Sequence, residues 1–529
     1  MLLRGWCCVG VRARTGIRAS SSSSGSDLPQ PPVAPRRADS HDVPELGTSI
    51  NDDLKWLRDD SRSDESVLQL MRDDNAHFSA HLERVIGDAA RSGLYSEMRG
   101  RIQEDDCSEA VRRHSFWYFT RTLAAKDYPV HCRCPVRDSL KHCSIGPQDA
   151  PNESELAHEQ TVLDENQRVE GCEFYEASAS VSPDGSLLAL AEDTSGDEVF
   201  TLRVREIATG REIIEPVNDT SGNIVWMNDS RTLLYTTKDS LMRPFKVWRF
   251  TVGEDQQQQE HELLFHENDD AFFIGIGKTR SEQLISIGCS SQVTSDVLAL
   301  KACDTTGQFT RLVQRMHNVE VEIDHSGDSL FLYRRSEDSP NGEVLAARLD
   351  MQQPLPTAGD LQQSIVHIIA HRLDTQIEDF VLSSNYMLLQ TRVDALPKII
   401  LYELSALKQQ RTEMVGMPVS FPRSMEVCEA ELGDCGDFES DVFRAVVTSP
   451  STPATTFDFH ASNPGKTSVK RVRPVKGDFD SERYEVRRIN VPSHDGREVP
   501  ATLTWRTDTA KLDGCDPCFM IVYGAYGMP

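Results

Sequence analysis

The sequence predicts a mostly β protein: a seven-bladed β-propeller that follows an N-terminal helical segment and precedes the first strands of a further domain. Apolar residues recur at helical spacing ahead of residue 107, and beyond it they alternate with polar residues in short runs separated by turns. These runs form units that repeat about every 45 to 55 residues, the length of a four-stranded propeller blade. A chain of 529 residues is also long enough for several domains.

Residues 1–26 form a basic leader that contains no acidic residue and includes a run of serines. This composition is typical of an organelle transit peptide, and a disordered basic tail would have the same composition. We therefore expect the protein in the cytoplasm or the mitochondrion. The basic residues are Arg4, Arg12, Arg14 and Arg18.

Residues 27–106 are predicted to form a proline-rich linker and then a helical segment. Asp64 is placed to cap the helix, because its carboxylate can accept a hydrogen bond from a free backbone N–H of the first turn. The apolar residues at three-to-four spacing are Val67, Leu70, Met71, Phe78, Leu82, Val85 and Ile86.

Residues 107–475 are predicted to form the propeller. The run "SVSPDGSLLALAED" and its counterparts each join two strands through a polar turn, and a third alternating run such as "FTLRVREI" follows. One four-stranded blade cannot bury both of its faces alone, so such units stack on their neighbours. Counting the runs gives seven blades, and an array of β-sandwiches is the alternative that the same alternation allows.

Residues 476–529 are predicted to begin another domain. Asp495-Gly496 lies between two alternating runs and favours a hairpin with a primed two-residue turn. The run "CFMIVYG" is fully apolar, as expected for a strand of a sheet that is covered on both faces, and it leads into the glycine loop "YGAYG".

The formal net charge of −27 argues against several classes of partner. It would repel nucleic acid and an anionic membrane surface, and no run of about 18 apolar residues predicts a membrane span. Cationic ligands would be attracted, and a highly charged surface also favours solubility. No cofactor or metal is predicted, because the close pairs Cys132/Cys134 and Cys515/Cys518 lack further ligands at zinc spacing.

Nine short motifs are spread along most of the chain: "LKWLRDD", "YSEMRGRIQEDD", "FWYFTRT", "YPVHCR", "LDENQRVEG", "VSPDGSLLALAEDTSGDE", "TPATTFDF", "HDGREVPATLTW" and "YGAYG". Together they resemble those of the prolyl oligopeptidase family of serine peptidases, and within it the oligopeptidase B group. The resemblance implies a seven-bladed propeller that caps an α/β-hydrolase domain, here represented only by its first strands. It also implies cleavage of short peptides after Arg or Lys.

The same resemblance implies a Ser-Asp-His triad whose serine lies in a Gly-x-Ser-x-Gly turn, and the 529 residues contain no such motif. We therefore expect this chain to be truncated before the nucleophile, the acid and the base, and to be inactive alone. The histidines beside the β runs are interpreted as surface or structural residues: His131, His142, His460 and His494.

Tyr523 is the candidate catalytic residue. The resemblance places it on a tyrosine whose hydroxyl donates to the oxyanion, a contact typically worth about 3 to 4 kcal/mol in the transition state. The sequence departs from the family just before it, with Ile521-Val522 where Tyr-Gly is usual. A packing aromatic at a strand end is the alternative for Tyr523, and Tyr526 is interpreted as packing.

An acidic run is interpreted as solvated loop charge rather than as a pocket for basic substrates: Asp434, Asp437, Glu439 and Asp441. Two functions stay open, a serine oligopeptidase represented here in part and a non-catalytic propeller that acts by binding. An apolar strand with an unpaired edge at residues 518–523 favours the first, because natural chains avoid such edges. The expected ligands are short peptides with basic residues, and nothing in the sequence sets an oligomeric state.

Overall fold

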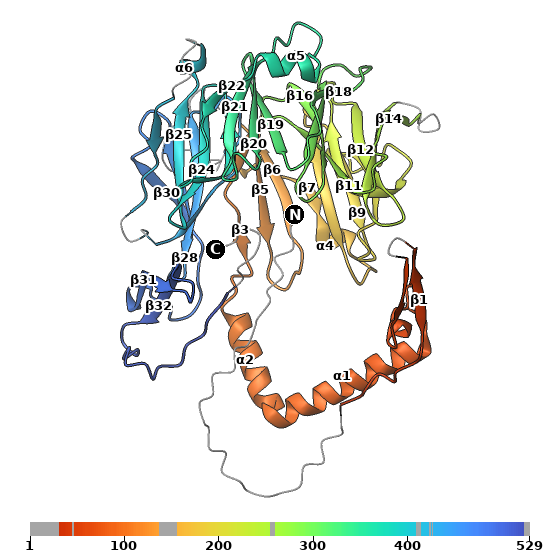
Figure 1. Ribbon diagram of the computed structural model, residues 1–529, viewed down its shortest axis with the longest axis vertical. Coiled ribbons are helices and arrows are strands. Elements are labelled where there is room, and N and C mark those ends of the chain that lie inside the picture. Colours follow the sequence, from red (N-terminus) through yellow and green to blue (C-terminus); the bar gives the residue numbers. More distant parts are fainter. Residues whose placement is uncertain are drawn as a thin grey trace, which may run out of the picture. The chain divides into compact units, whose positions relative to one another are not determined.

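The computed structural model describes residues 31–44, 47–136, 156–253, 260–408, 414–422, 425 and 427–522 (Figure 1). The chain divides into two compact units. The helical unit comprises Met1–Ile102, Val475–Asp478 and Pro517–Pro529, and the propeller unit comprises Gln103–Pro474 and Phe479–Asp516. The domain boundaries given above stay predictions.

The helical unit contains a small hairpin and two helices. Strands β1 (Ser40–Val43) and β2 (Thr48–Asn51) pair antiparallel, and they precede α1 (Glu65–Val85) and α2 (Asp88–Gly100). The predicted cap is confirmed, because the Asp64 carboxylate accepts a hydrogen bond of 2.7 Å from the backbone N–H of Ser66. None of the described helices combines the length and the apolar run that a membrane span needs.

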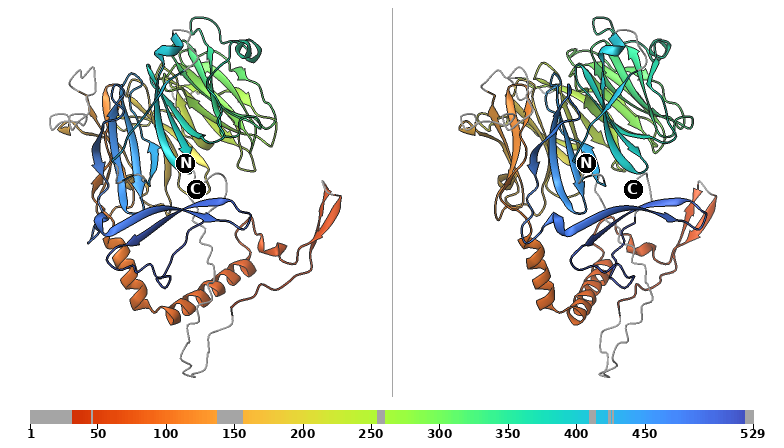
Figure 2. Two further views of the ribbon diagram at one scale, coloured as in Figure 1. Left: turned by 60° about the vertical axis from the view of Figure 1, so that its left-hand side comes forward. Right: turned by 90° about the vertical axis from the view of Figure 1, so that its left-hand side faces the viewer.

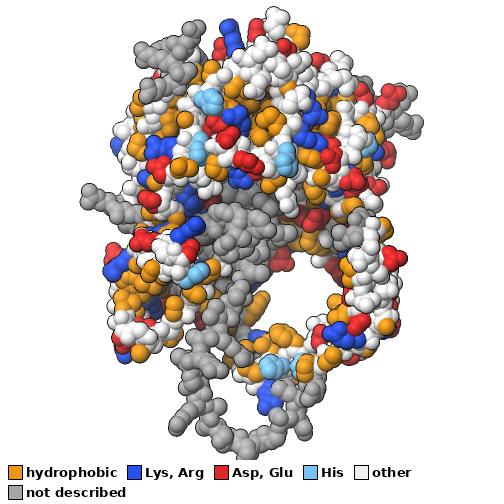
Figure 3. Space-filling model, in the orientation of Figure 1, with side chains coloured by type: hydrophobic (Ala, Val, Ile, Leu, Met, Phe, Trp, Pro, Cys, Tyr) orange, Lys and Arg blue, Asp and Glu red, His pale blue; other side chains and the backbone are white. Residues whose placement is uncertain are grey.

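The apolar stripe of these helices lies at the surface. Neither α1 nor α2 contains a buried residue. Phe78 is 61% exposed and Tyr95 is 67% exposed, and hydrophobic side chains are visible on this segment in Figure 3. The amphipathic pattern therefore predicted the helix correctly, while the described residues leave its apolar face open.

The propeller unit begins with a five-stranded sheet and continues with further antiparallel sheets in chain order (Figures 1 and 2). The first sheet contains β3 (Asp106–Cys107), β4 (Val111–Arg113), β5 (Phe116–Thr122), β6 (Val130–Pro135) and β7 (Gln160–Asp164), and α4 (Glu165–Arg168) follows it.

Four sheets of four strands each form the second half of the unit. Short helices α5 (Ala358–Gln363) and α6 (Ser405–Lys408) lie in two of their connections. The strands are β15 (Phe273–Lys278), β16 (Leu284–Ser290), β17 (Ser295–Lys301), β18 (Thr310–Val313); β19 (Glu320–Ser326), β20 (Ser329–Arg335), β21 (Glu343–Arg348), β22 (Val366–Ile369); β23 (Gln376–Leu382), β24 (Tyr386–Val393), β25 (Leu396–Glu403), β26 (Gly416–Pro418); and β27 (Glu429–Leu432), β28 (Val442–Ser449), β29 (Thr452–His460), β30 (Thr467–Val472).

The strands between these two parts form one continuous seven-stranded sheet. They are β8 (Glu176–Val181), β9 (Leu187–Asp193), β10 (Phe200–Glu206), β11 (Val217–Trp226), β12 (Thr232–Lys238), β13 (Pro244–Thr251) and β14 (Glu262–His266).

The β-propeller is confirmed, but the prediction of seven separate blades is wrong. Five of the described sheets have the size of a single blade, and β8–β14 are joined through β11. Thr220 of β11 lies opposite both Phe200 of β10 and Thr237 of β12, and the end of β11 pairs with β12, as in Ile224 opposite Tyr235. Gly222, with a φ of +82°, lies where the register with β12 shifts between Thr220 and Ile224, and such an irregularity bends a strand locally.

Packing between sheets buries the core. Val247 of β13 lies in one apolar cluster with Ile285 of β16, and Leu284 of β16 lies in the next cluster with Leu330 of β20. Each sheet therefore covers a face of its neighbour, as a propeller requires.

The first and last sheets of the ring meet through side chains. Arg471 of β30 pairs with Asp106 of β3, and its other terminal nitrogen lies 3.6 Å from Glu109. No strand of one sheet pairs with a strand of the other among the described residues. Figure 2 shows the two sheets side by side. We call this junction the seam.

The predicted hairpin is confirmed, with a different turn. Strands β31 (Tyr484–Pro492) and β32 (Glu498–Arg506) pair along their whole length. The Ser493 N–H donates to the Arg497 carbonyl at 2.7 Å, so three residues form the loop instead of two. Gly496 occupies its left-handed position with a φ of +81°, as in the three-residue loop that ends in a bulge.

The predicted apolar strand after the hairpin is wrong for its described residues. Residues 518–522 form no strand, and Phe519 is 81% exposed. A strand needs a neighbour to satisfy its backbone groups, and none of the described residues pairs with this segment. The described residues therefore form no α/β-hydrolase sheet.

Candidate functional site

Serine and histidine side chains lie within hydrogen-bond distance at three places among the described residues of the propeller unit, and two of these pairs are close. Ser281 Oγ lies 2.8 Å from His325 Nδ1, and Ser462 Oγ lies 2.8 Å from His460 Nδ1. Ser281 lies in the turn between β15 and β16, not at a strand-to-helix turn. His325 Nε2 is buried without a partner among the described residues, so no acid orients the ring and the pair is not a triad.

The other predicted positions are placed as follows. His131 Nε2 lies 2.7 Å from Glu165 Oε1, and His494 Nδ1 lies 3.4 Å from Ser493 Oγ. His142, Tyr523 and Tyr526 lie outside the described residues. The role assigned to Tyr523 therefore stays a prediction.

A pocket of about 390 Å³ lies at the seam. We call it the seam pocket. Strands β4 and β5 of the first sheet and β28 and β29 of the last sheet contribute to it, together with the loop between β27 and β28. Its walls are formed by Ala110, Val111, Arg112, Trp117, Asp434, Cys435, Gly436, Asp437, Glu439, Ser440, Asp441, Val442, Phe443, Arg444, Asp458 and His460.

Two of the pocket's acids are held by arginines of the first sheet. Asp434 accepts a hydrogen bond of 2.5 Å from Arg113, and Asp437 lies 3.1 Å from Arg112 Nε. Asp437 also accepts a hydrogen bond of 3.0 Å from the backbone N–H of His114, and burial raises the pKa of its carboxyl. The interpretation as solvated loop charge is therefore wrong for Asp437.

The wall from the last sheet holds a buried ion pair. Arg444 donates from Nε to Asp458 Oδ1 at 2.8 Å and from a terminal nitrogen to Asp458 Oδ2 at 3.1 Å. Lys470 lies 3.6 Å from the same carboxylate, which is 2% exposed. The charge of Asp458 is thus neutralised within its own sheet.

Three further polar groups of the pocket have no partner among the described residues. Asp441 Oδ1 and the indole N–H of Trp117 are both buried without a hydrogen bond, and Trp117 is 5% exposed. Glu439 is exposed and forms no hydrogen bond or ion pair with the described part of the chain. Sequence reasoning missed this site, because Trp117 and the acids are more than 300 positions apart and nothing local signals their contact.

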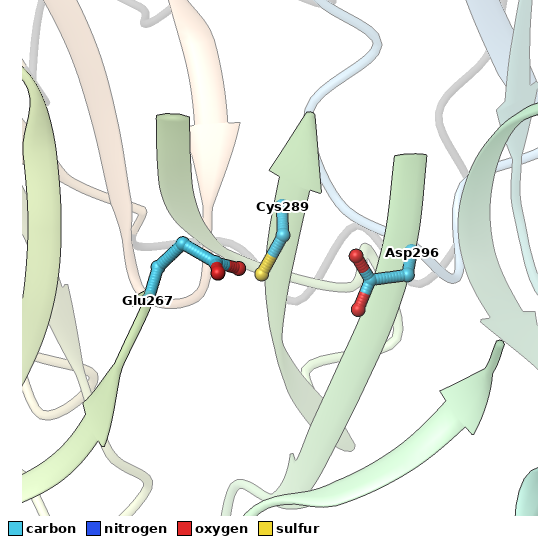
Figure 4. Close-up of side chains that lie close together, drawn as sticks. All are labelled: Glu267, Cys289 and Asp296. Atoms are coloured by element: carbon cyan, nitrogen blue, oxygen red, sulfur yellow. The ribbon is translucent and has the colours of Figure 1, made fainter. Parts of the chain in front are cut away.

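A second cluster lies inside the propeller unit and contains Glu267, Cys289 and Asp296 (Figure 4). The two carboxylates flank the thiol, and all three ligand atoms lie within 4.8 Å of one another. Arg315 donates to Asp296 at 2.7 Å and to Glu267 at 2.5 Å, and Arg311 pairs with Asp296.

Arg311 and Arg315 favour an ion-pair network over a metal site as the interpretation of the second cluster. Burial alone would raise the pKa of Glu267, but the hydrogen bond from Arg315 lowers it below its usual value. Burial raises the pKa of Cys289 to about 12, which keeps the thiol protonated beside the two carboxylates. Because the carboxylates are already paired with guanidinium groups, the cluster fits a buried ion-pair network between sheets.

Comparison with known proteins shows the family to which the chain belongs. The family model described as "Prolyl oligopeptidase, N-terminal beta-propeller domain" matches residues 32–472. The chain belongs to the prolyl oligopeptidase family of serine peptidases, through that propeller domain.

Particular relatives agree with this assignment. The chain is 31% identical to dipeptidyl aminopeptidase BI of Pseudoxanthomonas mexicana over 91% of its own length and 63% of the relative's. It is 23% identical to protease 2 of Moraxella lacunata, over 94% of this chain and 66% of that protein. The chain thus spans less than two thirds of either relative.

Solved structures share the fold. Oligopeptidase B from Leishmania major matches with a TM-score of 0.79 and 24% identity, over 90% of this chain and 65% of that one. Oligopeptidase B from Trypanosoma brucei with covalently bound antipain matches with a TM-score of 0.78 and 25% identity, over 91% and 66%.

Proposed function

We propose that this chain belongs to a serine-type oligopeptidase that cleaves short peptides after Arg or Lys, as the resemblance to oligopeptidase B implies. The observation that carries the proposal is the family match over residues 32–472. The net charge of −27 supports basic substrates, because a negative field attracts them. The propeller would allow only short peptides to reach the catalytic site.

We further propose that these 529 residues do not hydrolyse peptides alone. They contain no Gly-x-Ser-x-Gly motif, and none of the three described serine–histidine pairs has an orienting acid among the described residues. The test is turnover of a blocked fluorogenic Arg-Arg substrate by the purified chain. Turnover that a serine-directed inactivator abolishes would overturn this proposal.

The proposal of a peptidase is tested by sequencing the transcript beyond the codon for Pro529. We expect an open frame that encodes a Gly-x-Ser-x-Gly turn and then Asp and His, and we expect its product to cleave the Arg-Arg substrate. A stop codon followed by unrelated sequence would contradict this. It would favour the alternative, a non-catalytic propeller that acts by binding.

A second activity is supported by the 31% identity with dipeptidyl aminopeptidase BI. That relative's name describes release of dipeptides from a free amino terminus. Assaying the product of the longer open frame on the same peptide with a free and with an acetylated amino terminus separates the two activities. Cleavage of both forms supports the oligopeptidase, and cleavage of the free form alone supports the aminopeptidase.

The basic leader supports a mitochondrial or cytoplasmic location. Residues 1–26 fused to a fluorescent protein test this proposal. Import into mitochondria or retention in the cytoplasm agrees with it, and secretion contradicts it.

A further inference from the structure

We propose that the seam pocket binds the guanidinium or ammonium group of a basic peptide, through Glu439 and Asp441, while Trp117 donates to a carbonyl of the same peptide. This inference goes beyond the proposed hydrolysis and does not depend on it. It rests on the charge balance of the pocket, on its unpaired buried groups and on its volume.

The charge balance of the seam pocket favours a cation. Five carboxylates line it against two guanidinium groups. Arg112 is engaged by Asp437, Arg444 is engaged by Asp458, and Asp434 takes Arg113 from outside the pocket. The carboxylates left without a cationic partner among the described residues are Glu439 and Asp441.

The unpaired oxygen of Asp441 is the clearest sign of a missing donor. A buried carboxylate oxygen without a hydrogen bond is unfavourable, and the free energy is recovered only when a donor or cation reaches it. Arg112, Arg113 and Arg444 are held by other acids, and Arg280 donates to the carbonyls of Leu382 and Gly436, so a further donor is required. A guanidinium group presents several N–H donors in a plane and can bond two carboxylates together.

The indole N–H of Trp117 indicates what else the ligand contains. An indole N–H donates only, so it needs an acceptor oxygen. A bare metal ion would neutralise the carboxylates but would leave the indole N–H without an acceptor. A basic residue within a peptide offers both a cation and a backbone carbonyl.

The volume of the pocket suits such a ligand. At about 390 Å³ it falls within the range of roughly 300 to 1,000 Å³ that is typical of small-molecule sites. Two sheets supply the walls, with Trp117 on one side and Phe443 on the other. A bound peptide would therefore contact both sides of the seam.

The test is direct binding to the 529-residue chain by calorimetry. The ligands are acetyl-arginine methylamide, its citrulline counterpart, in which the guanidinium is replaced by a neutral urea, and calcium chloride alone. We expect the arginine compound to bind at one site, at least tenfold tighter than the citrulline compound, and calcium not to displace it. Equal affinity for the two compounds, or displacement by calcium, would overturn the proposal.

Variants locate the site. Glu439→Gln combined with Asp441→Asn should weaken arginine binding at least tenfold, and Trp117→Phe should weaken it several-fold because phenylalanine keeps an aromatic ring but has no N–H donor. Glu215→Gln, at an exposed acid of the propeller unit outside the seam, is the matched control and should bind as the unchanged chain does. Circular dichroism and thermal unfolding verify that each variant folds. Unchanged binding by the folded double variant would contradict the proposal, whatever the hydrolysis assay gives.

Discussion

The carboxylate of Asp324 on β19 accepts backbone hydrogen bonds but forms no ion pair among the described residues. Its Oδ1 accepts hydrogen bonds from the backbone N–H groups of His325 at 2.8 Å and Arg280 at 3.0 Å. The guanidinium of Arg280 donates instead to the carbonyls of Leu382 and Gly436. Burial therefore dominates and raises the pKa of Asp324 to about 6.

Substitution Asp324→Asn should remove a pH dependence of stability. Because the pKa of Asp324 is higher in the folded chain than in the unfolded one, the folded chain binds more protons between about pH 4 and 6 and loses stability as the pH rises through that range. Asparagine keeps the accepting oxygen and carries no charge. Relative to the variant, the unchanged chain should lose about 2 kcal/mol between pH 4 and 7. Urea unfolding at several pH values measures this, and a constant difference would contradict it.

Arg315 is the residue on which the buried ion-pair network depends most. Its guanidinium contacts both Glu267 and Asp296, which are 7% and 0% exposed, and lies 3.5 Å from the centroid of the Phe272 ring. Substitution Arg315→Met should lower the free energy of unfolding by about 3 to 5 kcal/mol, because buried Glu267 loses its arginine partner and buried Asp296 keeps only Arg311.

The control for Arg315→Met is Arg335→Met, which breaks a pair with Glu320 whose side chains are 43% and 36% exposed. That change should stay within about 1 kcal/mol. Equal losses for the two variants, measured by urea unfolding at pH 7, would show that burial does not set the strength of these pairs.

Among the strands, β11 differs from the prediction of separate blades, because it pairs with β10 on one side and with β12 on the other. The cause of this difference is local. Gly222 combines a φ of +82° with close contact, since a Cβ there would lie 3.2 Å from the Phe200 ring. Substitution Gly222→Ala should cost about 1 to 3 kcal/mol from the backbone alone, and the contact with Phe200 adds to this.

Gly210→Ala separates these two contributions. Gly210 has a φ of +72°, but a Cβ there would meet no atom within 4 Å. It should therefore lose only the backbone contribution. We expect a larger fall in thermal stability for Gly222→Ala than for Gly210→Ala, and the reverse order would argue against a packed bend in β11.

How far the sequence predicts an element depends on whether its partners are local. The cap at Asp64 and the hairpin around Gly496 depend on residues within a few positions, and both elements were predicted. The run at residues 518–522 reads as a strand from its composition, but strand formation needs a distant neighbour. The two-sided pairing of β11 was missed because alternation marks a strand and not its partners.

At the scale of the whole chain, the repeat length predicted a propeller, while its closure could not be predicted. The seam joins residues near 110 to residues near 440 and 470 through ion pairs such as Arg113 with Asp434. Each partner looks like an ordinary surface charge in its own segment. The seam pocket shares this origin, which is why the acids around Asp437 read as solvated loop charge.

The seam should open locally when its ion pairs are weakened. Substitution Arg471→Met removes the contacts with Asp106 and Glu109 that join β30 to the first sheet. Because no strand pairing reinforces this junction among the described residues, amide hydrogen exchange should rise in β3–β5 and β29–β30, while the sheets from β15 to β26 stay protected.

Arg334→Met is the matched control, since it breaks a pair with Glu343 between neighbouring strands of one sheet and should leave the seam unchanged. A uniform rise across all sheets would mean that the ring opens as one cooperative unit, and an unchanged pattern would mean that apolar packing alone holds the first and last sheets together.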